Sequence, residues 1–178
     1  MHNSLNKNEL AKWSLFKVGE LFDIHPTKAY KLTNKDLFVF DGINPVVVNS
    51  SYNNGIGGYT NFPTTEIGGI ITFSDTTTAD SIFYQINDFV GYPHVQGMYP
   101  IKYLDKWNQF SMLFFCTVFR QTAIAQGFDY GNKFTREIAK TLIVALPVKA
   151  DNTPDWDFME QYIADLLQKK TTVLKQLA

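Results

Sequence analysis

Residues 151–178 read DNTPDWDFMEQYIADLLQKKTTVLKQLA, a helix start followed by an amphipathic pattern. Asn152 or Thr153 can cap the helix, Pro154 suits its first turn, and the acidic side chains nearby suit its dipole. Apolar residues then recur at alternating spacings of four and three, as in a coiled coil. The predicted seam is Met159, Ile163, Leu166, Lys170, Val173 and Leu177. So short a helix is marginal alone, so we expect it to pack on its own domain or on another helix.

Upstream of this helix, short strand patterns are separated by turn-rich segments. The pattern predicts strands at Leu37–Phe40, Pro45–Asn49, Gly68–Ser74, Ser81–Ile86 and Leu142–Pro147, loops at Ser50–Pro63 and Phe89–Met98, and a buried helix at Leu104–Gln126 ended by Gly127. Strand and helix do not alternate regularly, which favours an α+β fold with a mixed or antiparallel sheet and a packed helix. We expect residues 1–150 to form one domain and residues 151–178 an amphipathic, coiled-coil-like helix.

Composition narrows the class of protein. The chain has 178 residues, is 45% hydrophobic and carries a net charge of -1, which argues against binding through a large positive field. Its lone cysteine, Cys116, cannot form an internal disulfide. The polar start and the short apolar runs predict neither a signal peptide nor a membrane span. We therefore expect a soluble, cytoplasmic protein.

Signatures of catalysis are missing from the sequence. It contains no Gly-x-Ser-x-Gly elbow and no Walker A lysine, and Gly55–Gly58 lacks the strand–helix frame of a dinucleotide site. The histidines His2, His25 and His94 are scattered, and no Cys/His cluster has zinc spacing. The sequence predicts a non-catalytic protein with no metal and no cofactor, while an enzyme with an unrecognised site stays as a minor hypothesis.

A series of short phrases occurs in a familiar order. They are Trp13-x-x-Phe16-Lys17-Val18-Gly19-Glu20-Leu21-Phe22, Asn53–Tyr59 after Pro45-Val46-Val47, Phe83-Tyr84-Gln85, Lys133-Phe134 with Ala145-Leu146-Pro147-Val148, and Met159-Glu160-x-Tyr162-Ile163. In this order the chain resembles the target recognition domain, and the helix that follows it, of type I restriction-modification specificity subunits.

The resemblance implies a role and a set of partners. Such subunits carry two recognition domains joined by antiparallel helices, and each domain reads one half of a split DNA target. Methyltransferase subunits dock on the specificity subunit, and another subunit cleaves the DNA. The expected partners are therefore double-stranded DNA, a DNA methyltransferase subunit, a restriction subunit held through the complex, and a second copy or a second recognition domain. With one domain and one helix, the chain resembles either a half-subunit that dimerises or one half of a longer chain.

Candidate DNA contacts are the amide, hydroxyl, aromatic and cationic side chains of the polar loops. Asn and Gln can pair with adenine, Arg or Lys with guanine, and hydroxyls with phosphates or bases. The candidates are Lys28, Tyr30, Lys31, Asn53, Asn54, Tyr59, Asn61, Thr76, Thr77, Thr78, His94, Gln96, Arg120, Lys133 and Arg136. The same loops are also consistent with ordinary surface turns. The alternative function is a protein-interaction or inhibitory module on the same scaffold.

Overall fold

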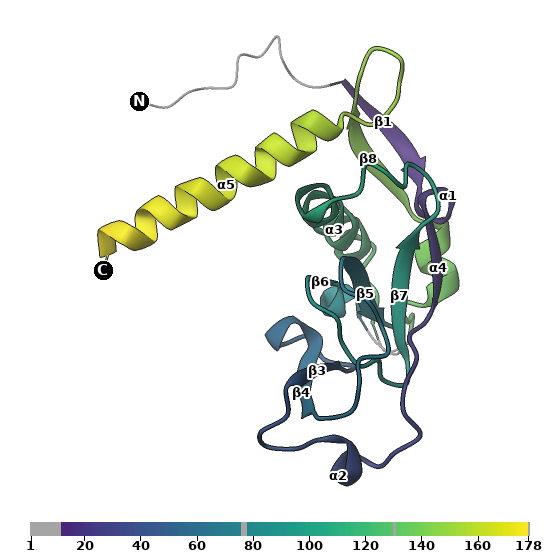
Figure 1. Cartoon of the computed structure of the whole chain (residues 1–178). Helices are drawn as coiled ribbons and strands as arrows, with labels where there is room; N and C mark the ends of the chain where they lie inside the picture. Colours follow the sequence, from purple (N-terminus) through teal and green to yellow (C-terminus); the bar gives the residue numbers. More distant parts are fainter. Residues whose placement is uncertain (1–11, 76–77, 130, 178) are drawn as a thin grey trace.

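A computed structural model describes residues 12–75, 78–129 and 131–177 (Figure 1). Its central sheet contains β2 (Phe22–Pro26), β7 (Val95–Pro100), β5 (Ile70–Ser74) and β6 (Phe83–Gln85), in that order. Each neighbouring pair is antiparallel. With the helices below, this arrangement confirms the predicted α+β class and the predicted hairpin of β5 and β6.

One face of the sheet packs on α3 (Gln109–Ala125). The ring of Phe119 lies 6.2 Å from that of Phe73 on β5, and Phe115 lies 4.6 Å from Phe22 on β2, centroid to centroid. Asn108 caps the helix by accepting the amides of Phe110 and Ser111. The helix is therefore the one predicted from the sequence, although it starts later, at Gln109.

Gly127 ends α3 as predicted. Its amide donates to the Ile124 carbonyl at 3.0 Å, and its φ of +69° is a conformation that glycine adopts at little cost. The lone Cys116 lies on the buried side of this helix, so its thiol belongs to the core.

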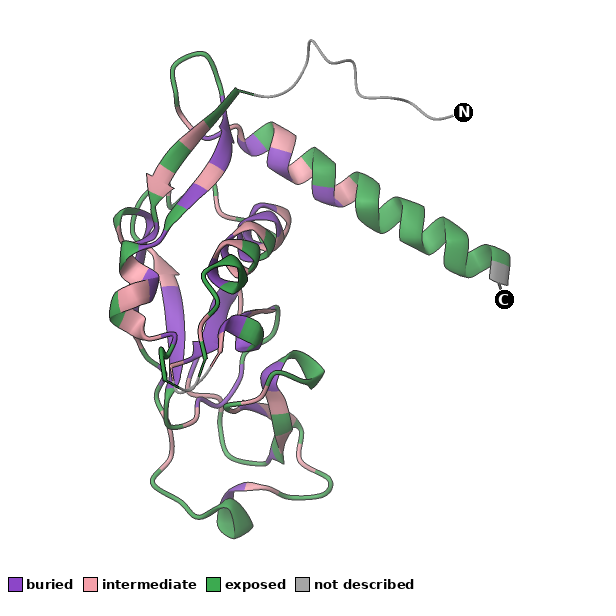
Figure 2. Cartoon of the chain, turned by 180° about the vertical axis from the view of Figure 1, so that it is seen from behind, coloured by how far each residue is buried: buried purple, intermediate pink, exposed green. Residues whose placement is uncertain are grey.

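A second antiparallel pair, β1 (Lys12–Lys17) and β8 (Ile143–Val148), leads into α5 (Trp156–Leu177). Two short helices accompany it, α1 (Val18–Leu21) before β2 and α4 (Arg136–Thr141) before β8. The first turns of α5 are anchored, because Trp156, Met159 and Ile163 are buried in the core. Trp156 stacks edge-on against Trp107 at 4.7 Å, and Trp107 lies 5.5 Å from Phe115. Beyond this root α5 projects away from the body with exposed sides (Figures 1 and 2).

The start of α5 corrects a prediction. Asp155 Oδ1 accepts the Phe158 amide at 3.2 Å, so Asp155 caps the helix in place of Asn152 or Thr153. Thr153 instead donates its hydroxyl to Asp151 Oδ1 at 2.7 Å, and Pro154 pairs with Val148 in an isolated bridge. Because residues 151–154 form a turn back onto β8, the helix begins at Trp156.

The other face of the sheet carries what we call the distal lobe, residues 27–66. It contains α2 (Asn34–Leu37), β3 (Asn44–Val47), the 3₁₀ turn η2 (Asn53–Gly55) and β4 (Ile56–Thr60), which pairs antiparallel with β3. Val47 of the lobe joins Ile70, Phe89 and Val95 in a buried cluster, and this cluster fixes the lobe to the sheet. A further turn, η3 (Ala79–Ser81), lies between β5 and β6.

Three predicted segments differ from the structure. The strand predicted at Leu37–Phe40 does not form: Leu37 is the last residue of α2, whose start is capped by Thr33 accepting the Asp36 amide, and residues 38–40 are not a strand. The predicted loop at residues 50–63 contains β4. The predicted loop at residues 89–98 contains the start of β7, which has neighbours on both sides. Gly97 misled that prediction, since the Tyr99 ring lies over it and a Cβ there would come within 2.7 Å of ring atoms.

Within the described ranges, no helix is long and apolar enough to cross a membrane. The same part of the chain holds no group of three or more His, Cys, Asp or Glu side chains placed to share a metal ion.

Candidate nucleic-acid interface

The ends of three strand segments meet at one edge of the sheet. β2 ends at Pro26, β5 is followed by Asp75, and β7 is preceded by His94. The antiparallel register places Pro26 and Phe73 opposite Gln96, one on each side of β7. The start of α4 closes the edge. The resulting strand-end pocket is lined by Pro26, Asp75, His94, Gln96, Thr135, Arg136 and Glu137.

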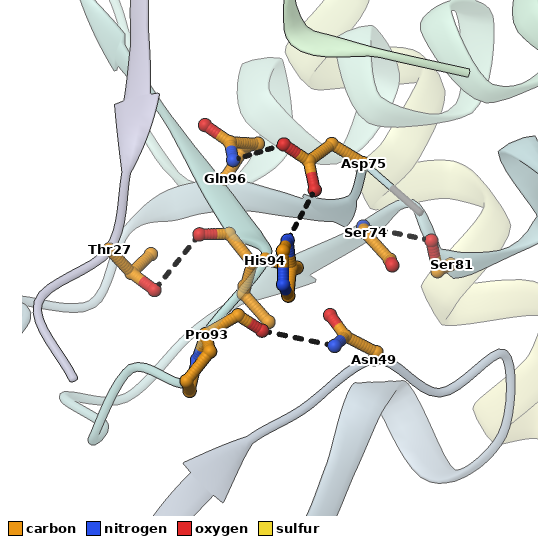
Figure 3. A network of polar contacts seen from close by, with 9 residues as sticks. Thr27, Asn49, Ser74, Asp75, Ser81, Pro93, His94 and Gln96 are labelled. Carbon is orange, nitrogen blue, oxygen red and sulfur yellow. Dashed lines mark hydrogen bonds and ion pairs between the residues drawn. The ribbon is translucent and has the colours of Figure 1, made fainter. Parts of the chain in front are cut away.

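Asp75 connects the polar groups of this pocket (Figure 3). Gln96 Nε2 donates to Asp75 Oδ2 at 2.7 Å, and His94 Nδ1 lies 3.5 Å from Asp75 Oδ1. His94 has a φ of +65°, and its carbonyl accepts the Asp75 amide at 3.1 Å. Gln96 is only 2% exposed while His94 is exposed. The amide therefore lies at the floor of the pocket and the imidazole at its rim.

The polar surface continues from the pocket onto the distal lobe. Asn49 Nδ2 donates to the Pro93 carbonyl at 3.0 Å, next to His94, and the Tyr92 hydroxyl donates to Asn34 Oδ1 at 2.8 Å. Asn34, Asn49 and Tyr92 line one shallow depression. We call this run from Asn34 through Asn49 and His94 to Arg136 the polar strip. Its amides, imidazole and guanidinium are groups that bind base edges and phosphates.

The distal lobe is held in place by a buried carboxylate. Glu66 accepts the Tyr99 hydroxyl and the Lys28 backbone amide, both at 2.6 Å. Burial, together with the bond to Glu66, raises the pKa of Tyr99 far above its usual value, so the phenol stays protonated. Its ring also stacks on His25 at 4.1 Å. The lobe and the sheet edge that form the strip are therefore tied to each other.

The structure brings together only some of the predicted DNA contacts. His94, Gln96 and Arg136 line the strand-end pocket, and the Arg136 Nε donates to Glu137 at 3.1 Å. Asn54 and Arg120 line a different depression, beside β6 and α3, which shares no lining residue with the strand-end pocket. There the Arg120 guanidinium lies 5.3 Å from the Phe83 ring centroid.

The side chains of two asparagines predicted to contact DNA form hydrogen bonds within the protein instead. Asn53 and Asn54 have φ values of +49° and +54°, which asparagine tolerates better than most residues. The Asn53 amide donates to the Ile56 carbonyl at 3.1 Å. The Asn54 amide donates to the Tyr84 carbonyl and to Gln85 Oε1, both at 3.2 Å. Both side chains therefore stabilise the conformation of the η2 turn.

The remaining predicted contacts in the described part of the chain line neither the strand-end pocket nor the depression beside β6 and α3. Tyr30 donates its hydroxyl to the Pro63 carbonyl at 3.0 Å, and Thr78 donates to Asp80 at 3.1 Å. The exposed ones are Lys28, Lys31, Tyr59, Asn61 and Lys133. Thr76 and Thr77 lie outside the described residues.

Sequence reasoning missed Asp75 and Asn49, which connect the strip. Asp75 directly follows the predicted strand Gly68–Ser74, and Asn49 ends the predicted strand Pro45–Asn49. Polar residues at strand ends are a usable signal. Which strand ends meet, however, depends on the order β2-β7-β5, and that order was not predicted.

Together, the α+β body, the polar strip at its sheet edge and the projecting helix define a class of domain built to present a hydrogen-bonding surface and a helical arm. The chain belongs to the family "Type I restriction modification DNA specificity domain", which matches residues 11–176. It is 30% identical over 158 residues to the specificity subunit S.BcgI of a type II restriction enzyme from Heyndrickxia coagulans, covering 88% of this chain and 44% of that protein.

Solved structures share the fold at low sequence identity. The type I restriction-modification S subunit from M. genitalium matches with a TM-score of 0.64 and 12% identity, over 96% of this chain and 42% of that one. The HsdS subunit from Thermoanaerobacter tengcongensis matches with a TM-score of 0.55 and 15% identity, over 93% of this chain and 39% of that one. The chain thus spans less than half the length of these relatives.

Proposed function

We propose that this chain binds double-stranded DNA sequence-specifically, as a specificity subunit, or half of one, in a restriction-modification system. The observation that carries the proposal is the polar strip, in which His94, Gln96 and Arg136 meet around Asp75 at one sheet edge. Membership of a DNA specificity family supports it. The strip supplies donors and acceptors that can follow a groove, with few positive charges to bind any duplex equally.

In this proposal the exposed part of α5 pairs with another helix, from a second copy or a second recognition domain. Leu166, Val173 and Leu174 are 40%, 52% and 67% exposed, while Met159 and Ile163 of the predicted seam are buried against the chain's own core. Lys170 is exposed, and the side chain of Leu177 lies outside the described part. The division at residue 150 stays a prediction, with the root of α5 packed in the core of the preceding domain.

The proposed role is recognition without catalysis. The chain would carry a methyltransferase subunit, and through the complex a restriction subunit, to the DNA site that it reads. The 30% identical relative S.BcgI is described as the specificity subunit of a restriction enzyme, which is consistent with this division of labour.

Selection from random DNA tests the proposal. The full chain is mixed with a pool of random duplexes, bound DNA is separated by electrophoresis, and several rounds are sequenced. One short motif should emerge, and a duplex carrying it should resist an excess of unrelated competitor. Binding all duplexes with equal affinity, or binding none, would contradict the proposal.

A pair of charge-matched variants locates the interface. Arg136→Gln should weaken binding to the selected duplex by about tenfold, because Arg136 lies in the strand-end pocket and loses a base or phosphate contact. Lys149→Gln removes the same charge from the turn before α5, where Lys149 pairs with Asp157 at 2.7 Å. This control should keep the affinity of the unaltered chain. Equal losses in both would place binding elsewhere.

A further inference from the structure

Asp75 fixes which way the Gln96 amide faces. A carboxylate only accepts hydrogen bonds, so the amide must turn its NH₂ toward it. The Nε2–Oδ2 distance of 2.7 Å is that of a charge-assisted bond. Figure 3 shows the Gln96 oxygen pointing away from Asp75. A glutamine amide can in general donate through its NH₂ or accept through its oxygen. Here the NH₂ of Gln96 is used by Asp75, and the oxygen is left to accept from a ligand.

The strand-end pocket therefore contains two acceptors that need donors. Gln96 Oε1 and Asp75 Oδ1 are both buried, and neither has a hydrogen-bond partner in the part of the chain that the structure describes. His94 Nδ1 lies 3.5 Å from Asp75 Oδ1, an ion-pair contact without hydrogen-bond geometry. Buried acceptors without donors are costly, so the pocket favours a ligand that brings N–H groups.

The rim residue His94 lies next to one of these oxygens. His94 is exposed, with 65% of its side chain accessible, and its contact with Asp75 is long. A donor that binds Asp75 Oδ1 would take the place of the imidazole. The exchange trades a weak contact for a hydrogen bond, and the freed imidazole can face a neighbouring phosphate or base.

We propose that the Asp75–Gln96 pair reads an exocyclic amino group of a base and so selects adenine or cytosine at one position of the target. In the major groove adenine offers its N6 amino group and cytosine its N4 amino group, whereas guanine and thymine turn O6 and O4 outward. A keto oxygen would meet two acceptors and leave all of them unpaired. The inference rests on the proposed DNA recognition and names its chemistry at this pocket.

Asp75→Asn is the decisive variant. With an amide at position 75 the Gln96 amide is free to turn over and present its NH₂ to the pocket. Random-duplex selection on the full chain should find adenine or cytosine at one motif position for the unaltered protein. With Asp75→Asn that position should relax or move to guanine or thymine, and the other positions should stay the same. Affinity for the original motif should fall by about tenfold.

Two controls separate this reading from loss of charge or loss of fold. Asp105→Asn removes one negative charge from an exposed turn, where Asp105 pairs with Lys106 at 3.2 Å, and should leave the motif unchanged. Gln96→Met keeps the volume but removes the acceptor, so it should lose the preference for an amino group without gaining one for a keto group. If Asp75→Asn unfolds, Gln96→Met carries the test alone.

Base analogues test the donor directly. Purine in place of the selected adenine, or 2-pyrimidinone in place of the selected cytosine, lacks only the amino group. The unaltered chain should bind such a duplex about tenfold more weakly than the parent duplex. The Gln96→Met variant should bind the two duplexes equally. Unchanged binding to the analogue would mean that only water satisfies the two oxygens, and would overturn the inference while leaving the motif intact. Absence of any motif would instead overturn the proposed function.

Discussion

At the scale of single residues, Cys116 shows how the core affects ionisation. It is buried on the inner side of α3, and burial raises the pKa of its thiol from 9.0 to about 12, against a smaller lowering by the charge of Arg120. The folded chain therefore holds this proton at pH values where the unfolded chain releases it. The contribution of the protonated thiol to the free energy of unfolding is complete below pH 9, and it is lost as the pH rises toward 12.

This predicts an alkaline loss of stability that depends on Cys116. Between pH 9 and 12 the thiol should lower the free energy of unfolding by up to about 1.4 kcal/mol per pH unit. Cys116→Ala lacks this component, so its urea denaturation midpoint should approach that of the unaltered chain as pH rises from 7.5 to 10.5. Tyr84 and Tyr99, whose pKa values are also raised by burial, lower stability equally in both proteins. Parallel pH profiles would contradict the prediction.

At the scale of elements, the sequence correctly predicted the helices and strands that are encoded by a local pattern of residues. The helical spacing around Phe110–Val118 and the glycine at 127 predicted α3, and the β-branched run at residues 46–48 predicted β3. The pattern failed at β7, where Pro93, His94 and Gly97 indicate a loop. Its strand form comes from neighbours distant in sequence, β2 and β5, and from the Tyr99 ring that covers Gly97.

The candidate site was likewise predictable only where residue type alone was informative. Residue type alone suggested His94, Gln96 and Arg136, which the structure gathers in one pocket. It could not reveal that Asp75 orients Gln96, because that contact depends on the pairing of β5 with β7. Nor could it show that the Asn54 amide is used to hold a turn on β6.

The cap of α3 gives a prediction at this scale. Asn108→Ala removes the acceptor of two amides at the helix start and should lower the free energy of unfolding by about 1 kcal/mol. Asn61→Ala, at an exposed position just after β4, is the matched control and should change it by less than about 0.5 kcal/mol. Chemical denaturation measures both. Equal effects would mean that the cap contributes nothing specific.

At the scale of the whole molecule, α5 has a buried part and an exposed part. Its root shares the core with α3, where Phe158 and Tyr162 meet Phe114 at ring distances of 6.3 and 5.7 Å. Its outer part is exposed along its length (Figure 2), and the apolar residues Leu166, Val173 and Leu174 are among the exposed ones. Exposed apolar surface of this kind on a helix is characteristic of an unfilled interface.

Substitutions in the two parts should therefore act differently. Replacing Leu166, Val173 and Leu174 together by Gln should abolish self-association measured by light scattering, while thermal unfolding of the monomer stays the same. Met159→Ala, in the root, should instead lower the free energy of unfolding by about 2–5 kcal/mol, because Met159 is fully buried. An unaltered chain that is monomeric at every concentration would contradict pairing between copies.

A row of aromatic rings runs from the root of α5 through the interior. Trp156 contacts Trp107, Trp107 contacts Phe115, Phe115 lies 6.0 Å from Phe119, and Phe119 meets Phe73, which pairs with Gln96 on the neighbouring strand β7. Close-packed rings resist bending far more than a flexible linker would. The row therefore makes the root of α5 and the sheet one stiff body. If the chain binds DNA as proposed, a partner bound to α5 would also set the angle at which the polar strip meets the duplex.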